Sequence, residues 1–283
     1  SDVVVENYGP GTMAGWGLSY EDVRAIKPDI VYLSMPAAGS YGPMRDVITY
    51  GMTLASICGL DALTGYVGQG PQCFEQAYSD PYNGLLGAFA VMAALRQRRR
   101  TGEGQRIEYS QQEAGLQMAG QAFMEWFLNG RDYGPMENRH PTGAAAPHGV
   151  FPAAGDDRWI AIACYTDEEW RRLVAVMGNP EWARDPRYDT APGRVADTDV
   201  IHAFISEWTA ARGDRGLEAL LQESGVAATP VLTVADLFWD PHYRERGTWI
   251  EQVHPVEGRG WGYGAYVKMS ETSLHTGVGP WIG

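Results

Sequence analysis

The chain has 283 residues, of which 45% are hydrophobic and 20% charged, a composition typical of a globular protein and not of a disordered one. Its formal net charge of −13 argues against a nucleic-acid partner, because binding to phosphates requires a basic surface. No apolar stretch reaches the roughly 18 residues of a membrane span, so no membrane association is expected. The three cysteines are widely spaced and form no CxxC motif, which favours reduced thiols and a cytoplasmic location.

The first part of the chain predicts strands and helices in alternation. A β-branched run over residues 2–6 predicts a strand, and the glycine-rich segment 7–11 predicts a turn after it. Residues 19–26 predict a short helix with Ser19 as its N-cap, and the apolar residues 30–35 predict a buried strand. Strand, helix and strand in this order are typical of a parallel α/β sheet.

The strongest helix signal lies at residues 79–100. Asp80 stands directly before Pro81, which predicts an N-cap followed by a proline in the first helical position. The apolar residues behind it cover most of the circumference, so the helix is expected to be buried along nearly its whole length. Asp80 is therefore either a structural cap or a catalytic carboxylate at the positive end of a helix, and residue type alone favours the cap.

The rest of the chain predicts a boundary between two domains. Residues 47–63 and 111–128 predict helices, residues 106–110 a strand, and residues 129–147 have no hydrophobic period and predict a linker. Beyond it we expect strands at 148–151, 159–164 and 225–231, and helices at 166–177 (capped by Thr166), 196–210, 215–224 and 234–246, the last interrupted at Pro241. A hairpin is expected after residue 248, with WIEQVHP and YGAYVKMS as its strands. The predicted organisation is a large α/β domain over 1–128, a linker over 129–147, a small α+β domain over 148–235 and a return segment over 236–283.

Three stretches together resemble the class III (formyl-CoA-transferase-type) CoA-transferases. They are VVVENYGPG, GLSYEDVRAIKPDIVYLSMPAAGSYGP, and DPYNGLLGAFAVMAALRQRRRTGEGQRIEYS, which match the family's patterns in the family's order. The resemblance implies a Rossmann-like large domain and a smaller α+β domain, in two chains that interlock as a homodimer. It also implies that this chain lacks the N-terminal part of the family fold.

The resemblance assigns chemistry to particular residues. The family's nucleophilic aspartate matches Asp80, which would attack an acyl-CoA thioester and pass CoA to a carboxylic acid through an aspartyl anhydride and an aspartyl-CoA thioester. Coenzyme A is thus expected as part of a substrate, with an acyl-CoA and a small carboxylic acid as partners and no metal. Positions that match CoA-lining segments are Asn7, Tyr8, Gly9, Val47, Ile48, Thr49 and Tyr50.

Other positions match or depart from a relative that acts on oxalate. Gly143, Ala144 and Ala145 match that enzyme's mobile glycine loop, in which the two alanines are glycines. Gly51 stands where that enzyme has a glutamate beside its site, and Gly15 stands where some relatives have an arginine. Both departures indicate an acceptor other than oxalate.

Two other functions remain open. The related α-methylacyl-CoA racemases use a histidine with the aspartate, and the histidine aligns with Tyr50 here. Tyrosine is a poor base at neutral pH, so transfer is favoured over racemisation. The other alternative is a truncated, catalytically incompetent CoA-transferase-like chain.

Overall fold

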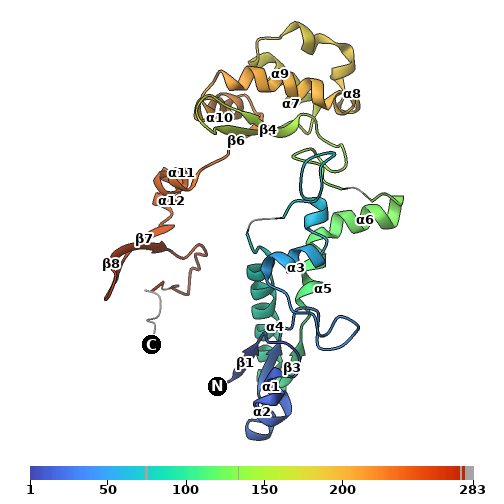
Figure 1. The fold of residues 1–283 in the computed structure, drawn as a ribbon. Coiled ribbons are helices and arrows are strands. Elements are labelled where there is room, and N and C mark those ends of the chain that lie inside the picture. Colours follow the sequence, from blue (N-terminus) through green and yellow to red (C-terminus); the bar gives the residue numbers. More distant parts are fainter. Residues whose placement is uncertain (74–75, 133, 275, 278–283) are drawn as a thin grey trace. The chain divides into compact units, whose positions relative to one another are not determined.

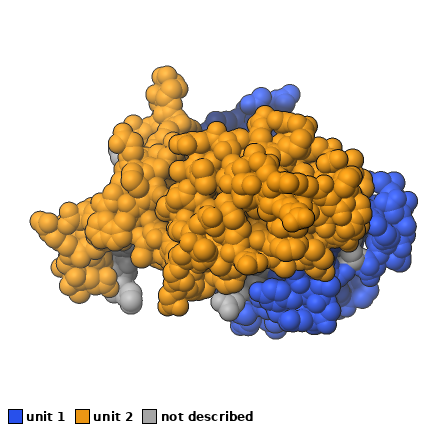
Figure 2. Space-filling view, turned by 90° about the horizontal axis from the view of Figure 1, so that it is seen from above, with its two compact units in different colours: residues 1–141 blue, residues 142–283 orange. Residues whose placement is uncertain are grey.

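The computed structural model describes residues 1–73, 76–132, 134–274 and 276–277 (Figure 1). The chain divides into two compact units, residues 1–141 and residues 142–283, which Figure 2 colours blue and orange.

A three-stranded parallel sheet with the order β1-β2-β3 organises unit 1. Its strands are β1 (Val3–Glu6), β2 (Val31–Ser34) and β3 (Gln105–Glu108). All four residues of the central strand β2 are buried, because it has a neighbour on each side and carries VYLS. Glu6 pairs in register with Ser34, so the carboxyl ends of β1 and β2 lie side by side. The predicted strands and their parallel arrangement are confirmed.

Short helices follow the first two strands. Helix α1 (Thr12–Gly15) follows the glycine-rich turn, and α2 (Tyr20–Ile26) begins after Ser19, whose hydroxyl accepts from the Asp22 amide in a capping box. The predicted helix 47–63 is too long. Residues 47–50 are not helical, α3 spans Gly51–Ile57, and a 3-10 turn η1 (Asp61–Leu63) follows Gly59, whose φ of 81° ends the helix.

Helix α4 (Ser79–Thr101) is the longest element of unit 1, and two expectations about it are wrong. It begins before Asp80: Tyr78 is the N-cap and Asp80 lies inside the first turn, so Asp80 caps nothing. It is also not buried all round, since Leu85, Phe89 and Met92 are 64%, 68% and 61% exposed.

The face of α4 that packs inward carries small and polar residues. Ser79, Asn83, Gly87 and Ala94 are its buried residues. A Cβ on Gly87 would lie 3.0 Å from the sulfur of Met35, so glycine permits this close approach of the helix to the segment that follows β2. Close packing through small side chains leaves the large apolar ones on the opposite face.

The predicted helix 111–128 is divided into three pieces. They are α5 (Gln111–Leu116), η2 (Gln117–Ala119) and α6 (Gly120–Asn129). Helices α3 and α5 pack together around Cys58, and a Cβ on Gly115 would lie 2.4 Å from the Cys58 sulfur. Leu54, Ala55, Leu60 and Ala119 complete this small apolar cluster.

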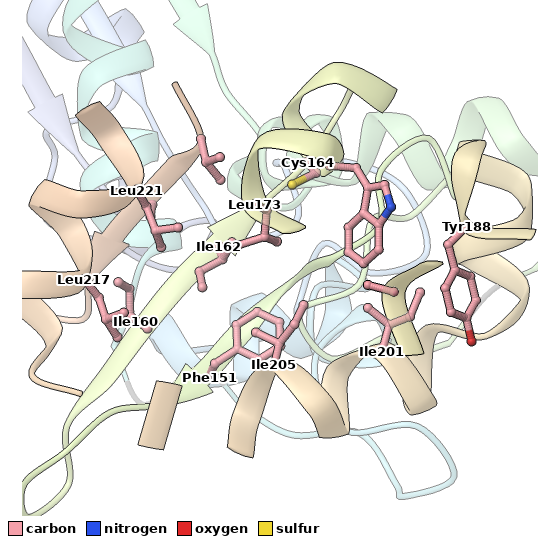
Figure 3. Close-up of a cluster of buried hydrophobic side chains, with 14 residues drawn as sticks. Phe151, Ile160, Ile162, Cys164, Leu173, Tyr188, Ile201, Ile205, Leu217 and Leu221 are labelled. Atoms are coloured by element: carbon pink, nitrogen blue, oxygen red, sulfur yellow. The ribbon is translucent and has the colours of Figure 1, made fainter. Parts of the chain in front are cut away.

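Unit 2 is built on an antiparallel sheet with the order β4-β5-β6, whose strands are β4 (His148–Pro152), β5 (Trp159–Ala163) and β6 (Ala227–Pro230). Its helices are α7 (Asp167–Val176), α8 (Ala191–Ala196), α9 (Thr198–Ala210) and α10 (Asp214–Glu223), with 3-10 turns η3 (Glu181–Arg184) and η4 (Pro186–Asp189). Figure 3 shows the core between the sheet and these helices, in which Phe151, Ile162, Leu173 and Leu221 are almost fully buried. The α+β arrangement and the Thr166 capping box with Glu169 are confirmed.

The end of unit 2 carries two short helices and a hairpin. Helices α11 (Val234–Trp239) and α12 (Pro241–Glu245) meet at Pro241, as predicted. The hairpin consists of β7 (Trp249–His254) and β8 (Gly258–Tyr263). Its second strand is GRGWGY, so the prediction that YGAYVKMS pairs with β7 is wrong: the chain reverses directly after His254, and Trp249 pairs with Tyr263.

Candidate functional site

A cleft of about 730 Å³ opens in unit 1 at the carboxyl end of β1. It brings together three parts of the chain that lie far apart in the sequence: the turn after β1, the segment before α3, and the first turn of α4. Of the residues singled out in the sequence, Asn7, Tyr8, Gly9, Val47, Ile48, Thr49, Tyr50 and Asp80 all line this cleft.

The Asp80 side chain has a free carboxylate. It is exposed in the first turn of α4, and within the described residues no hydrogen bond or ion pair reaches its oxygens. Its backbone N–H donates to the Ala77 carbonyl at 3.1 Å, so the backbone is held while the carboxylate is not. A carboxylate in this state has lone pairs available to attack a bound molecule.

Gly51 lies against the Asp80 carboxylate. A Cβ at position 51 would lie 2.8 Å from Asp80 Oδ2 and 2.3 Å from the Ala77 Cβ. A Cβ atom, which makes no hydrogen bond, does not approach other heavy atoms this closely, so no side chain at position 51 fits this arrangement. The absence of a side chain at Gly51 therefore creates the space in which the Asp80 carboxylate lies.

Three hydrogen bonds in series connect the start of α4, where Asp80 lies, to Tyr109 and to Gly51. Tyr109 Oη donates to Asn83 Oδ1 at 2.9 Å, Asn83 Nδ2 donates to the Ser79 carbonyl at 2.8 Å, and Ser79 Oγ donates to the Gly51 carbonyl at 3.0 Å. Ser79 and Asn83 are 0% and 1% exposed. Burial raises the pKa of Tyr109 from 10.0 to about 12, so its hydroxyl remains a donor at neutral pH.

Glu6 holds the turn that forms one wall of the cleft. The Tyr8 amide donates to Glu6 Oε2 at 2.9 Å, and the Ser34 hydroxyl donates to the other carboxylate oxygen. Glu6 is 9% exposed, so both of its oxygens are used inside the protein. A buried carboxylate that accepts from two donors fixes the path of residues 6–8.

The segment before α3 reaches the cleft because the helix begins late. The amide of Tyr50 donates to Thr53 Oγ1 at 2.9 Å at the start of α3, and residues 47–50 remain outside the helix. Ile48 and Tyr50 are 79% and 83% exposed.

The loop of small residues at 143–145 lies in unit 2 and is held at one end. Gly143 has a φ of 65°, Ala144 is exposed, and Ala145 is 5% exposed. Arg194 Nε donates to the carbonyl of the next residue, Ala146, at 2.7 Å. The loop is therefore anchored directly after Ala145 by a fully buried guanidinium.

Several residues in or next to the cleft were not singled out from the sequence. Glu6 and Asn83 line it, Ser79 precedes Asp80 in α4, and all three are polar and buried. Tyr109 donates a hydrogen bond to Asn83. One signal was available: Ser79, Asn83 and Gly87 recur every four residues, which marks one face of a helix. Their pairing with Gly51 and Tyr109 is not visible in any local pattern.

Neither a metal centre nor a membrane span is found in the described part of the chain. No group of three or more His, Cys, Asp or Glu side chains there could hold a metal ion. None of the helices in the same residues has the length and apolar character to cross a bilayer.

Comparison with known proteins places the chain among CoA-transferases. Residues 1–282 match the family described as CoA-transferase family III. A probable CoA-transferase of Mycobacterium tuberculosis, Rv1866, is 33% identical over 92% of this chain and 33% of its own length. The succinyl-CoA–D-citramalate CoA-transferase of Chloroflexus aurantiacus is 30% identical over 91% of this chain and 63% of its own length.

A solved structure agrees with this placement. A CaiB/BaiF family protein from Brucella suis has a TM-score of 0.86 and 30% identity, and the match covers 97% of this chain and 70% of that one. The chain spans between a third and two thirds of the length of the two curated relatives named above. By its sequence and its fold, the chain belongs to CoA-transferase family III.

Proposed function

We propose that this chain moves CoA from an acyl-CoA to a carboxylic acid, with Asp80 as the nucleophile. The observation that carries the proposal is the free Asp80 carboxylate, exposed in the wall of a cleft of about 730 Å³. A carboxylate that caps a helix or forms an ion pair has its oxygens occupied, whereas this one has none occupied by the described residues.

The first half of the reaction removes the original acyl group. An Asp80 oxygen attacks the thioester carbonyl and the carbon–sulfur bond breaks, which gives an acyl-aspartyl anhydride and the CoA thiolate. The thiolate then attacks the aspartyl carbonyl of the anhydride. The first carboxylate leaves, and Asp80 holds CoA as an aspartyl thioester.

The second half repeats these steps in reverse order with the acceptor. The acceptor carboxylate attacks the aspartyl thioester carbonyl and releases the thiolate, which forms a second mixed anhydride. The thiolate attacks the acceptor's carbonyl, the new acyl-CoA leaves, and the Asp80 carboxylate is restored. No net proton is gained or lost, so the cycle needs no general base beside Asp80.

The position of Asp80 suits this chemistry. The first turn of the 23-residue helix α4 carries the positive end of the helix dipole, which stabilises negative charge close to it. Both the free carboxylate and the oxyanion formed during attack carry such charge beside this helix end.

The residues of the cleft favour the thioester end of the substrate. Among the described residues that line it, none is Lys or Arg, so this cleft supplies no cationic side chain for the phosphates of CoA. Val5, Val47 and Ile48 provide apolar surface, and the turn at residues 7–9 provides backbone groups. We expect the pantetheine arm and the acyl group to occupy it.

The relatives suggest a dicarboxylic acyl group. The Chloroflexus enzyme is named for succinyl-CoA as donor, and another relative from Agrobacterium fabrum is named succinate–glutarate CoA-transferase. We therefore propose succinyl-CoA as the donor and a dicarboxylic acid larger than oxalate as the acceptor.

Trapping with hydroxylamine tests the proposal. The purified chain is incubated with succinyl-CoA and hydroxylamine, and peptides are analysed by mass spectrometry. We expect a hydroxamate at Asp80 in the wild type and none in Asp80→Asn, while Asp46→Asn, a change at an exposed aspartate paired with Arg45, behaves as the wild type. Absence of the hydroxamate from the wild type would overturn the proposal and leave the racemase and the incompetent chain as the alternatives.

The racemase alternative predicts a different product. Racemisation requires a second acid–base group at the α-carbon. The residue that aligns with the racemase histidine is Tyr50, which is 83% exposed at the cleft. Incubation with a chiral 2-methylacyl-CoA in deuterated water separates the two reactions. Transfer leaves the α-hydrogen in place, whereas racemisation exchanges it for deuterium.

A further inference from the structure

We infer that Asn83 is a positioning residue for Asp80, and that it acts through the hydrogen-bonded chain from Tyr109 to Gly51. The inference rests on the proposed role of Asp80 as nucleophile and adds a residue that acts on it from within the same helix. Its basis is the set of three consecutive hydrogen bonds, of 2.9, 2.8 and 3.0 Å, that join Tyr109, the residue directly after β3, to α4 and α3.

The Asp80 side chain has little support of its own. Within the described residues nothing binds its carboxylate, so the position of the carboxylate depends on the backbone of residues 79–80. A nucleophile has to be held to within about 0.5 Å of its productive geometry to react efficiently. The groups that fix Ser79 therefore also determine where Asp80 lies.

Ser79 is fixed from two sides. Its hydroxyl donates to the Gly51 carbonyl, and its own carbonyl accepts from Asn83 Nδ2. The first bond sets the start of α4 against the start of α3, where Gly51 leaves room for the Asp80 carboxylate. The second bond ties the same residue to the next turn of α4.

Tyr109 anchors this series of hydrogen bonds to the sheet. Tyr109 donates its hydroxyl to Asn83 Oδ1, and its backbone N–H donates to the Ser34 carbonyl at 3.0 Å, at the end of β2. The Asn83 side chain can rotate only if it gives up both of its bonds. Because Asn83 is 1% exposed, water cannot readily replace them, and the chain resists distortion.

Asn83 lines the cleft, but Tyr109 does not. This difference separates positioning from direct contact with the substrate. A contact made only by Asn83 would survive the loss of the Tyr109 hydroxyl, whereas a positioning chain would be weakened by it.

Two variants and one matched control test the inference. Asn83→Ala removes the middle of the chain, and Tyr109→Phe removes only the hydroxyl that anchors it. The control is Tyr32→Phe, which also removes a phenol hydroxyl. Tyr32 lies in the buried strand β2, its hydroxyl donates to the Leu18 carbonyl at 3.0 Å, and it does not line this cleft.

We expect kcat for CoA transfer to fall about 100-fold in Asn83→Ala and about 10-fold in Tyr109→Phe, with the KM for acyl-CoA changed by less than about twofold. The double variant should lose no more than Asn83→Ala alone, because both changes break the same chain. Tyr32→Phe should keep the wild-type kcat. A wild-type kcat in Tyr109→Phe would overturn the inference.

A second readout is independent of the reaction. Amide hydrogen exchange at Asp80, whose N–H donates to Ala77, should accelerate in Asn83→Ala and Tyr109→Phe and not in Tyr32→Phe. Unchanged exchange in the first two variants would overturn the positioning role. Accelerated exchange in a chain that shows no hydroxamate would instead support the positioning role and reject the proposed reaction.

Discussion

Gly51, at the start of α3, lies directly against the carboxylate of Asp80, in the first turn of α4. The point at which a Cβ of residue 51 would lie is 2.8 Å from Asp80 Oδ2, and the same point is 2.3 Å from the Ala77 Cβ. The carboxylate thus takes the place that a side chain at position 51 would fill.

Gly51→Ala should therefore displace Asp80. Because the Ala77 backbone also lies close, at 3.1 Å from the added atom, the start of α4 has to move. We expect kcat to fall about 100-fold and the free energy of unfolding to fall by about 1–3 kcal/mol. Kinetics and urea denaturation measure the two effects.

Gly216→Ala is the matched control for that change. Gly216 lies in α10, where an added Cβ has no heavy atom within 4 Å. The substitution should stabilise the helix by about 0.5–1 kcal/mol and leave kcat unchanged. Equal losses of activity in both variants would argue against the steric account of Gly51.

Arg194 should be essential for the stability of unit 2. Its side chain is fully buried and donates to the Ala146 and Tyr188 carbonyls at 2.7 and 2.9 Å and to Asp167 at 2.9 Å. Arg194→Met leaves these acceptors without their donor, and we expect it to lower the free energy of unfolding by about 3–5 kcal/mol. Chemical denaturation measures the loss.

Arg187→Met is the control for Arg194. Arg187 is 63% exposed and pairs with Asp185 and Asp197 at the surface. Its loss should change stability by no more than about 1 kcal/mol. Limited proteolysis adds a second measurement: cleavage near Gly143 should increase in Arg194→Met alone, because Arg194 anchors the loop directly after Ala145.

Unit 2 should lose stability in acid through Asp236. A hydrogen bond from Arg158, with further bonds from Thr233, lowers the pKa of Asp236 from 3.8 to about 2. Because the pKa is lower in the folded state, the stabilisation is complete above about pH 4 and is lost as the pH falls toward about 2. Thermal unfolding between these values should show the decline.

Asp236→Asn should remove this part of the acid dependence, because the amide does not titrate. Asp156→Asn, a change at an exposed aspartate of the turn between β4 and β5, should retain it. An unchanged decline in Asp236→Asn would assign the effect to other carboxylates.

The cysteines should differ in reactivity. Cys58 and Cys164 are buried, and burial raises the pKa of both thiols, that of Cys164 to about 12. Cys73 is exposed. Iodoacetamide applied to the folded chain at about pH 8 should therefore modify Cys73 alone of the three, as seen by mass spectrometry. Modification of Cys164 at a similar rate would show that unit 2 opens readily.

The exposed apolar face of α4 should be covered in solution by a second copy of the chain. Leu85, Phe89 and Met92 lie on this face, each more than 60% exposed, and large contiguous apolar surfaces of this kind are typical of interfaces. Phe89→Asp should shift the protein from dimer to monomer in analytical ultracentrifugation. Gln97→Asp, on the exposed end of the same helix, should leave the dimer intact, and a wild-type monomer would contradict the prediction.

The sequence by itself determined the elements whose causes are local. Ser19 and Thr166 cap their helices through residues three positions later, and the β-branched runs form the strands that were expected. The order of motifs was also sufficient to indicate the family and to single out Asp80. These features depend on neighbours along the chain, and a single sequence contains them.

The tertiary structure decided the surroundings of Asp80. The Asp–Pro pair predicts a cap at Asp80, but the helix already includes Ser79, whose hydroxyl donates to the Gly51 carbonyl, a group distant in sequence. The apolar residues of α4 predict burial all round, but the small residues Gly87 and Ala94 and the polar Asn83 face inward. Which face of a helix packs, and which carboxylate stays free, depends on the surface it meets, and that surface forms only when distant segments come together.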